Sequence, residues 1–224
     1  MTLLMSINLY INLYNDPNPK RDLELKFCYA QNQKNIHINN IYVVKSQDRI
    51  MFSKLFQKVH ETSGERDINI IANSDVYFNN SIVHVLKIHN NHVYALSRWN
   101  KTPKGLSRAR AVGSADAWIF RGKKDIYSDF YLGYWGCDGR LGHEIIKAGY
   151  KLYNPSLTIK PIHVHTSHIR AGRSSPFQNK TDVVVGPYAG AIACTIDKLI
   201  EGKNIISPMP KHYILPKDSN VGSV

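Results

Sequence analysis

Short apolar segments alternate with segments of helical periodicity along most of this sequence, and this alternation is what most constrains its fold. Strands alternating with helices are typical of an α/β domain with a mostly parallel central sheet flanked by helices. A length of 224 residues fits one such domain. The pattern predicts strands at Ile7–Leu13, Ile41–Val44, Ile68–Ala72, His92–Leu96, Ala117–Phe120 and Leu157–Val164, and helices at Arg21–Gln33, Phe52–Val59 and Asp138–Gly149.

The last fifty or so residues carry weaker signals. Val183–Val185 favours a strand and Ala189–Ile200 a helix, and the end is rich in Pro, Lys and Ser. We therefore expect a domain at residues 1–175 and a C-terminal extension at 176–224 that packs on it and has a mobile end.

Composition excludes some classes of protein and leaves others open. No stretch approaches the roughly 18 apolar residues of a membrane helix. The apolar start lacks a basic region and a cleavage site, so we interpret it as a core strand rather than a signal peptide. Three cysteines, odd in number and far apart, favour a reducing cytosol. The net charge of +12 suits nucleic acid, an anionic membrane, a phosphorylated ligand or simply solubility.

The strand at Ile68–Ala72 ends abruptly in the polar run Asn73-Ser74-Asp75. Open α/β sheets bind ligands at the carboxyl ends of their strands. A carboxylate there, beside an amide and a hydroxyl, suits Mg²⁺ or Mn²⁺ bridging a diphosphate, because these ions prefer oxygen ligands. The same residues also occur in turns that merely end a strand, so this segment alone leaves both interpretations open.

A second motif, Gly-Tyr-Trp-Gly-Cys-Asp-Gly-Arg, occupies residues 133–140 ahead of an amphipathic helix. Its glycines permit a close approach of the backbone, and Asp138 is suited to cap the helix. A carboxylate at the mouth of a site can also act as a general base on an acceptor hydroxyl. Arg140 is suited either to a phosphate or to the surface.

Two histidines and three further polar or aromatic residues complete the candidates. His163 and His165 point to the same face of a strand, a spacing used by metal sites and also by ordinary polar strands. Without matching cysteines a structural zinc site is disfavoured. Asp116 beside Trp118 could bind a sugar hydroxyl and stack on a sugar face, and Arg98 could bind phosphate; each is also common in ordinary strands and salt bridges.

The motifs become more specific when taken in order. They read Ile-Ala-Asn-Ser-Asp-Val-Tyr-Phe, Ala-Leu-Ser-Arg-Trp, Asp-Ala-Trp-Ile-Phe, Gly-Cys-Asp-Gly-Arg, Asn-Pro-Ser-Leu-Thr-Ile and His-Val-His-Thr-Ser. This series resembles the small GT-A-type glycosyltransferase domains of large DNA viruses and bacterial polysaccharide gene clusters, over about residues 5–170. The resemblance implies a GT-A-like, Rossmann-like domain with a nucleotide-binding half at about 1–100 and an acceptor-binding half at about 101–175.

The resemblance also implies roles for particular residues. Asp75 would bind the metal within the Asp-x-Asp motif, although Asn73 stands where the family has the first Asp. His163 or His165 would complete the metal site, and Asp138 would be the base of an inverting transfer. Asn73, Ser74 and Arg98 would hold the donor, Tyr14, Asn15 and Arg49 would face its nucleotide base, and Asp116, Trp118 and Arg140 would contact substrate.

The resulting hypothesis is transfer of a sugar from a UDP-sugar to a hydroxyl of a glycan acceptor, assisted by Mn²⁺ or Mg²⁺, in the cytoplasm and in a virus-infected host if the gene is viral. A basic nucleic-acid-binding module is a rival, but no recognition helix with a basic face is evident, which disfavours it. A metal-dependent nucleotidyltransferase or phosphohydrolase, or a non-catalytic remnant that binds sugar nucleotides, would use the same residues.

Overall fold

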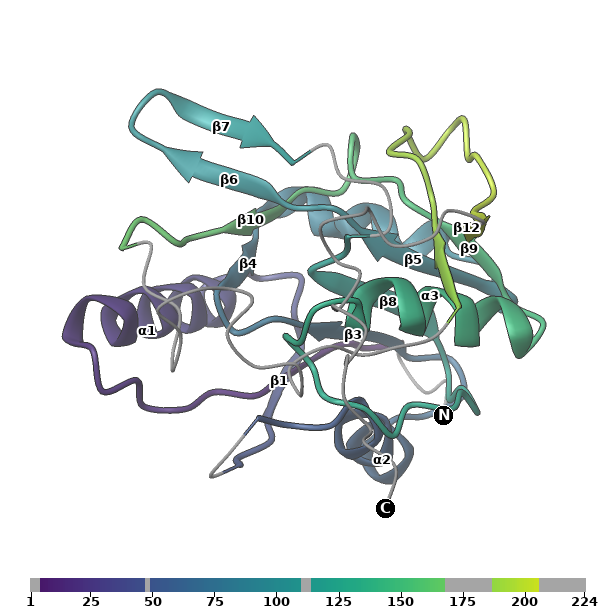
Figure 1. Ribbon diagram of the computed structural model, residues 1–224, viewed down its shortest axis with the longest axis horizontal. Helices are drawn as coiled ribbons and strands as arrows, with labels where there is room; N and C mark the ends of the chain where they lie inside the picture. The colour runs from purple at the N-terminus through teal and green to yellow at the C-terminus, as the bar shows by residue number, and fades with distance from the viewer. Residues whose placement is uncertain (1–4, 47–48, 110–113, 168–186, 206–224) are drawn as a thin grey trace, which may run out of the picture.

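A computed structural model of the chain describes residues 5–46, 49–109, 114–167 and 187–205 (Figure 1). Its main sheet has six strands in the order β2-β1-β3-β8-β5-β9. Parallel pairing joins β1 to β2 and β3, and β5 to β9, whereas β8 runs antiparallel to both of its neighbours. The α/β class is confirmed, and the sheet is mixed. The strands are β1 (Ile7–Ile11), β2 (Asn40–Val43), β3 (Ile68–Ala72), β5 (His92–Leu96), β8 (Ala117–Arg121) and β9 (Lys151–Tyr153).

A smaller sheet of four strands in the order β4-β10-β6-β7 lies beside the main one. In this sheet β10 pairs antiparallel with β4 and parallel with β6. A separate two-stranded sheet joins β11 to β12. The bounds are β4 (Val76–Phe78), β6 (Trp99–Thr102), β7 (Gly105–Arg108), β10 (Pro161–His163), β11 (Tyr188–Gly190) and β12 (Lys203–Ile205).

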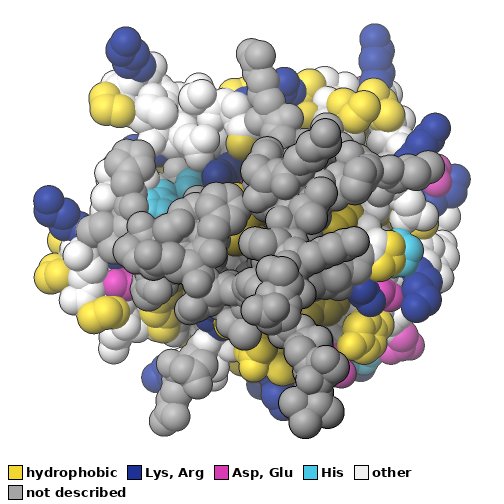
Figure 2. All heavy atoms as spheres, viewed as in Figure 1, with side chains coloured by type: hydrophobic (Ala, Val, Ile, Leu, Met, Phe, Trp, Pro, Cys, Tyr) yellow, Lys and Arg dark blue, Asp and Glu magenta, His cyan; other side chains and the backbone are white. Residues whose placement is uncertain are grey.

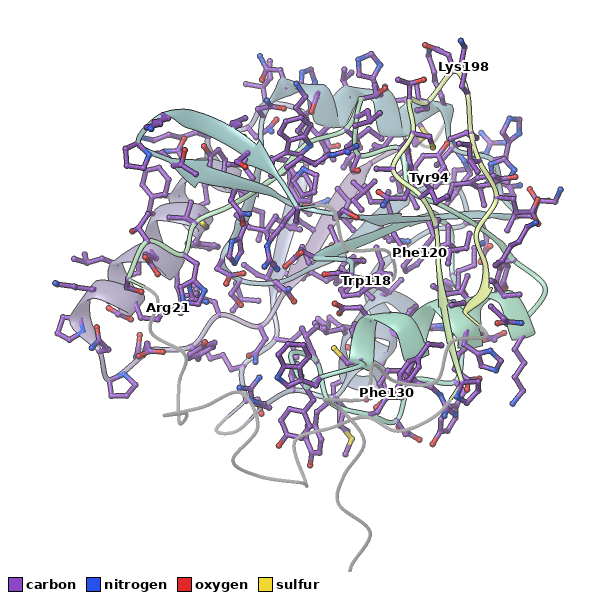
Figure 3. The ribbon with its side chains drawn as sticks, turned by 45° about the horizontal axis from the view of Figure 1, so that its top comes forward. Arg21, Tyr94, Trp118, Phe120, Phe130 and Lys198 are labelled. Carbon is purple, nitrogen blue, oxygen red and sulfur yellow. The ribbon has the colours of Figure 1, made fainter. Side chains whose placement is uncertain are left out.

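Helices cover both faces of the main sheet. On one face, α2 (Phe52–Thr62) and α3 (Cys137–Lys147) pack on a core that includes Trp118 and Phe120, and Figure 3 shows these two rings in the interior. On the other face lies the 3₁₀-helix η1 (Asn80–Lys87), while α1 (Pro19–Gln33) lies beside β4. Burial on both faces explains why β3 is apolar except for Asn69, whose side chain donates to the Ser63 hydroxyl and the Gly122 carbonyl. None of the helices in the described ranges is long and apolar enough to span a bilayer.

The starts of the helices explain where the predicted boundaries shift. The Asn18 side chain accepts hydrogen bonds from the Lys20 and Arg21 amides, and Pro19 occupies the first turn, so α1 begins two residues before the predicted start. At α2, by contrast, no side chain caps the helix. The carbonyls of Phe130 and Ser128 instead accept from its first amides at 3.0 and 2.9 Å, which ties the segment before α3 to α2.

Two sequence predictions are wrong. Of the strand expected at Leu157–Val164, only Pro161–His163 is extended, because the amides of Thr158 and Ile159 turn back to the Pro155 carbonyl. The helix expected at Ala189–Ile200 is instead the end of β11 followed by turns, since Ala189 pairs with β12. The strand expected at Val183–Val185 and the end of the extension lie outside the described residues. The strands β4, β6, β7, β9, β11 and β12 were not anticipated.

The surface carries its positive charge in scattered positions. Figure 2 shows Lys and Arg side chains spread over the described part of one face, with few Asp and Glu among them. The three cysteines, Cys28, Cys137 and Cys194, are buried thiols.

The contact between α3 and β11 gives a test of the packing of residues 187–205. A Cβ added at Gly142 would lie 2.6 Å from the Ala189 carbonyl oxygen. Although alanine favours helices, we expect Gly142→Ala to destabilise the protein by about 1–3 kcal/mol in urea unfolding, because the backbone has no room to yield. Lys147→Ala, on the exposed side of α3, should change stability by less than about 0.5 kcal/mol. A stabilised Gly142→Ala variant would contradict this packing.

Candidate functional site

The turn between β3 and β4 holds Asp75 at the junction of the two sheets. The Ser74 hydroxyl donates to the Asn12 carbonyl at the end of β1, which fixes the turn against the main sheet. The Asp75 carbonyl accepts from the Val164 amide at 2.9 Å, which fixes it to the end of β10. As a result the Asp75 side chain is buried, with the residue only 8% exposed.

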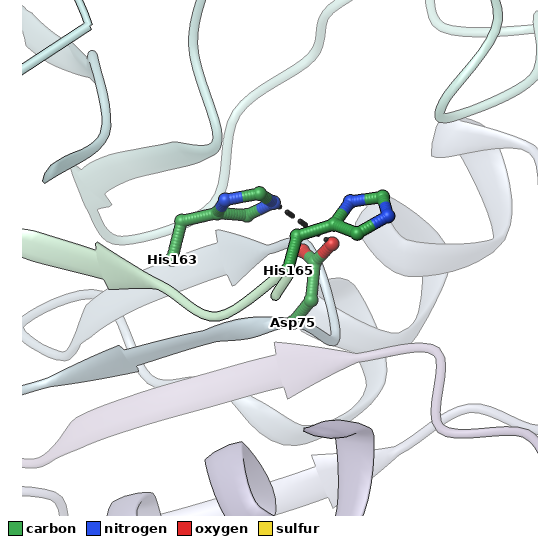
Figure 4. A group of neighbouring side chains, drawn as sticks. All are labelled: Asp75, His163 and His165. Atoms are coloured by element: carbon green, nitrogen blue, oxygen red, sulfur yellow. Dashed lines mark hydrogen bonds and ion pairs between the residues drawn. The ribbon is translucent and has the colours of Figure 1, made fainter. Parts of the chain in front are cut away.

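Asp75, His163 and His165 converge, as Figure 4 shows. Each offers one ligand atom, and these atoms lie within 4.8 Å of one another. His163 Nε2 lies 3.0 Å from Asp75 Oδ2, and its Nδ1 lies 3.2 Å from Asn100 Oδ1. The two histidines share a face because they are two residues apart in extended chain. The structure thus brings together the three residues predicted to bind metal.

Arg21 is a fourth member of this cluster and was not predicted. Its Nη2 donates to Asp75 Oδ2 at 2.5 Å, and its Nη1 donates to the Val164 carbonyl at 3.3 Å. Figure 3 shows Arg21 on the side of α1 turned toward the body of the protein. A positive charge is therefore built into the site by the protein itself.

Glu24 continues the network one turn further along α1. It accepts from Arg21 Nη1 at 3.0 Å, from the Thr166 hydroxyl at 2.9 Å, and from the Ser167 amide and hydroxyl at 2.7 and 3.0 Å. Burial alone would raise the pKa of Glu24, but these hydrogen bonds lower it to about 2. Glu24 thereby clamps the segment that follows His165 to α1.

The charges around Asp75 keep it ionised. Burial by itself would raise the pKa of Asp75, but His163 and then Arg21 outweigh it and hold the pKa well below its usual range. One carboxylate and two imidazoles form a donor set that suits transition metals, so of the two predicted ions Mn²⁺ fits better than Mg²⁺. Oδ2 already faces Arg21 and His163, and within the described residues Oδ1 accepts no hydrogen bond, which leaves it the oxygen for such an ion.

A second buried network fixes the other end of the same turn. The backbone N–H of Asn73 donates to the Asp116 backbone carbonyl, and its side-chain Nδ2 donates to Asp116 Oδ1, both at 3.0 Å. Arg98 Nη1 donates to both Asp116 carboxylate oxygens at 3.2 and 3.3 Å. Asp116 is 3% exposed and engaged with protein partners, so its place here is to hold the turn and Arg98 rather than to meet a sugar hydroxyl.

Asp138 lies in the first turn of α3, directly next to this network. Its Oδ2 accepts from the Ala115 amide at 3.3 Å, and the Cys137 thiol donates to its Oδ1 at 3.2 Å. Burial, with the Asp116 carboxylate adding to it, raises the pKa of Asp138 to about 7. Asp138 and Asp75 are thus connected through neighbouring chain segments at one edge of the main sheet, and Asp138 has the pKa of a group that exchanges protons near neutrality.

The loop after β1 contributes two buried acceptors. Asn12 Oδ1 and Asp16 Oδ2 have no hydrogen-bond partner among the residues that the structure describes. Buried acceptors are nearly always paired, so these atoms are suited to donors from a ligand or water. Between them, Tyr14 is partly buried; burial raises its pKa, and the charge of Arg21 opposes the rise. Asn15 is exposed.

Of the three remaining predicted residues, Trp118 and Arg140 contact partners outside the Asp75 cluster, whereas the charge of Arg49 acts on Tyr14 in the loop after β1. Trp118 is fully buried in the core, edge-on to Phe52 with ring centroids 4.9 Å apart, so its ring has no face to offer a sugar. We therefore reassign it to the core. Arg140 forms a salt bridge with Glu144 on its own helix at 2.6 Å. Arg49 donates to the Gly133 carbonyl at 2.8 Å and lies over the Tyr134 ring, beside the loop that leads to Asp138.

No family model matches the sequence, and no curated protein matches it.

The clamp made by Glu24 predicts a specific dependence of stability on pH. A carboxyl whose pKa is about 2 in the folded protein and 4.5 in the unfolded chain stabilises the fold above pH 4.5. That contribution, about 3 kcal/mol from the size of the shift, is lost as pH falls from 4.5 to 2. Urea unfolding of Glu24→Gln should therefore show a weaker loss of stability over this window. The exposed Glu61→Gln variant should keep the wild-type slope, and equal slopes for all three proteins would rule the clamp out.

Proposed function

We propose that this chain is a glycosyltransferase of the GT-A type that moves a sugar from a nucleotide-diphosphate donor, with a UDP-sugar as the first choice, to a hydroxyl of a glycan. The observation that carries the proposal is the convergence of Asp75, His163, His165 and Arg21 at the carboxyl end of β3. A buried cluster with one carboxylate, two imidazoles and a guanidinium suits a diphosphate bridged by a divalent ion.

The arrangement of strands supports the same proposal. On one side of β3 lie β1 and β2, which run parallel to it. On the other side lies β8, which is reversed, followed by β5 and β9, which run in the direction of β3 again. Five of the six strands thus run in one direction, which supports the proposed Rossmann-like fold, and Asp75 follows the carboxyl end of β3, where open α/β sheets bind ligands. The unpaired acceptors of Asn12 and Asp16 lie in the loop after β1, where hydroxyl or N–H donors of a nucleoside would satisfy them.

The proposed chemistry is a single displacement. An acceptor hydroxyl attacks the anomeric carbon, its proton passes to Asp138, and the bond from that carbon to the diphosphate oxygen breaks, releasing UDP. Arg21 stabilises the negative charge that develops on the leaving group, since a fixed cation in a buried site acts strongly there. A bound divalent ion, held by Asp75, His163 and His165, would share that task as a Lewis acid.

Asn73 stands where the Asp-x-Asp motif has its first Asp, and a role for Arg21 in stabilising the leaving group would reduce the need for that second carboxylate. The residue that would supply a second carboxylate is an amide here, and its Nδ2 donates to Asp116. The turn after β3 therefore carries one carboxylate where an Asp-x-Asp motif carries two, so this turn binds a free cation more weakly. We therefore propose that the metal binds chiefly together with the donor diphosphate.

Calorimetric titration with UDP tests the donor site. UDP should bind the wild-type protein at least about tenfold more tightly with Mn²⁺ than with a chelator, and His165→Gln should remove most of that difference. His165→Gln leaves the ion pair of Arg21 and Asp75 intact. Asp75→Asn keeps the shape of the side chain and should also remove most of the difference in UDP affinity between Mn²⁺ and chelator. His89→Gln, outside the cluster, is the control. Absence of UDP binding under both conditions would reject the proposal, and steeply salt-dependent retention on DNA would favour the nucleic-acid rival.

The pH dependence of transfer tests the base. Asp138 accepts a proton only when ionised, so the rate should rise roughly tenfold per pH unit up to about 7 and then level off. Asp138→Asn should bind UDP normally and lose transfer, whereas Asp125→Asn, whose side chain is 98% exposed, should keep the wild-type profile. Full activity in Asp138→Asn would remove the residue from this role. Release of phosphate or pyrophosphate instead of UDP would favour a nucleotidyltransferase or phosphohydrolase.

A further inference from the structure

A basic groove lies at the end of β2, the strand next to β1, and the proposed displacement at Asp138 assigns no role to its lysines. It has a volume of about 470 Å³ and runs between the end of β2, the start of α2 and Tyr131. Among the lining residues that the structure describes, four are basic and one is acidic: Lys45, Arg49, Lys54, Lys58 and Glu61.

The positive charge of the groove is only partly neutralised. Glu61 pairs with Lys58 at 3.1 Å and also accepts from the Gln57 side chain. No salt bridge joins Lys45 or Lys54 to any acidic residue in the described ranges, and both side chains are exposed. A concave surface with uncompensated cations concentrates anions more effectively than a flat one.

The wall of the groove is preorganised on the side nearest Asp138. Arg49 is held by the Gly133 carbonyl at 2.8 Å and lies 5.1 Å from the centre of the Tyr134 ring. The Tyr131 and Tyr134 rings lie 5.2 Å apart, and Tyr131 is 37% exposed. An exposed tyrosine combines an apolar ring face with a polar end, a surface suited to the face and the hydroxyls of a sugar.

The groove is within reach of the proposed base. Tyr134 precedes Asp138 by four residues, so their Cα atoms lie within roughly 14 Å even if the chain between them were extended. The Cys137 amide returns to the Tyr134 carbonyl at 3.2 Å, which makes the path shorter. A chain of a few sugars lying on Tyr131 can therefore present a hydroxyl to Asp138.

The geometry points to an acidic glycan as the acceptor: its carboxylate, sulfate or phosphate groups bind Lys45, Arg49 and Lys54, and its end reaches Asp138. This assignment rests on the proposed function. A nucleic acid would need a longer basic track, since specific interfaces bury roughly 1,000–2,500 Å² of protein surface. In the described part of the face in Figure 2, the Lys and Arg side chains are scattered and form no such track.

The test is calorimetric titration of the whole chain with a sulfated hexasaccharide, a neutral hexasaccharide and a single-stranded RNA of equal charge. We expect the sulfated sugar to bind the wild-type protein more tightly than the other two. The double variant Lys45→Gln/Lys54→Gln should weaken that binding roughly three- to tenfold, because each exposed charge contributes modestly. The control Lys104→Gln/Lys198→Gln removes the same charge from exposed positions outside the groove and should leave binding unchanged. Thermal unfolding checks that both variants fold.

Several outcomes would overturn the assignment: no binding of the sulfated sugar, equal losses in the two double variants, RNA binding as tight as that of the sulfated sugar, or displacement of the sugar by UDP. UDP titration of the same variants separates this inference from the proposed function. If the groove variant loses the sulfated sugar and keeps UDP, both stand. If the wild-type protein binds UDP but not the sulfated sugar, only the acceptor assignment fails. If the wild-type protein binds the sulfated sugar but not UDP, the transferase proposal fails, and the acceptor role with it.

Discussion

The buried ion pair between Arg21 and Asp75 is the interaction on which the rest of the site depends. Two charges removed from water are tolerated only when further partners satisfy them. Here Glu24 satisfies Arg21 from the α1 side, and His163 satisfies Asp75 from the β10 side. Removing either member of the pair would leave a buried charge without its partner. The ion pair therefore joins helix, turn and strand into one unit, and it fixes the Arg21 guanidinium beside the Asp75 carboxylate.

Much of the framework follows from local sequence patterns. The boundaries of β3 and β5 are those predicted, because short, mainly apolar segments bounded by polar residues have few alternatives. The short strands β4, β6 and β7 were missed because their pattern is weak and they exist only through pairing with β10 and with each other. The expected helix after Ala189 failed for a related reason: contacts with α3 and β12 override a local preference.

The site residues that lie in recognisable sequence motifs could be predicted, and those on an ordinary helix surface could not. Asp75, His163 and Asp138 were found because each stands at the end of a strand or the start of a helix. Arg21 and Glu24 resemble an ordinary pair of charges one turn apart on a helix surface. Nothing local distinguishes them from the exposed pair Lys58 and Glu61, and only the fold brings Arg21 against Asp75. Trp118 was misassigned for the opposite reason, since an aromatic residue next to an acidic one suits a core strand equally well.

The long separations in sequence within the cluster have a consequence for how the protein is made. Asp75 meets Arg21 across 54 residues and His163 across 88, and Glu24 meets Ser167 across 143. Contacts that close such long loops form late in folding, because the entropy of closure must be met before the contact contributes. During synthesis, the first helix therefore waits for β10 to leave the ribosome before its charges are fully matched. The candidate site is therefore complete only after β10 has been synthesised.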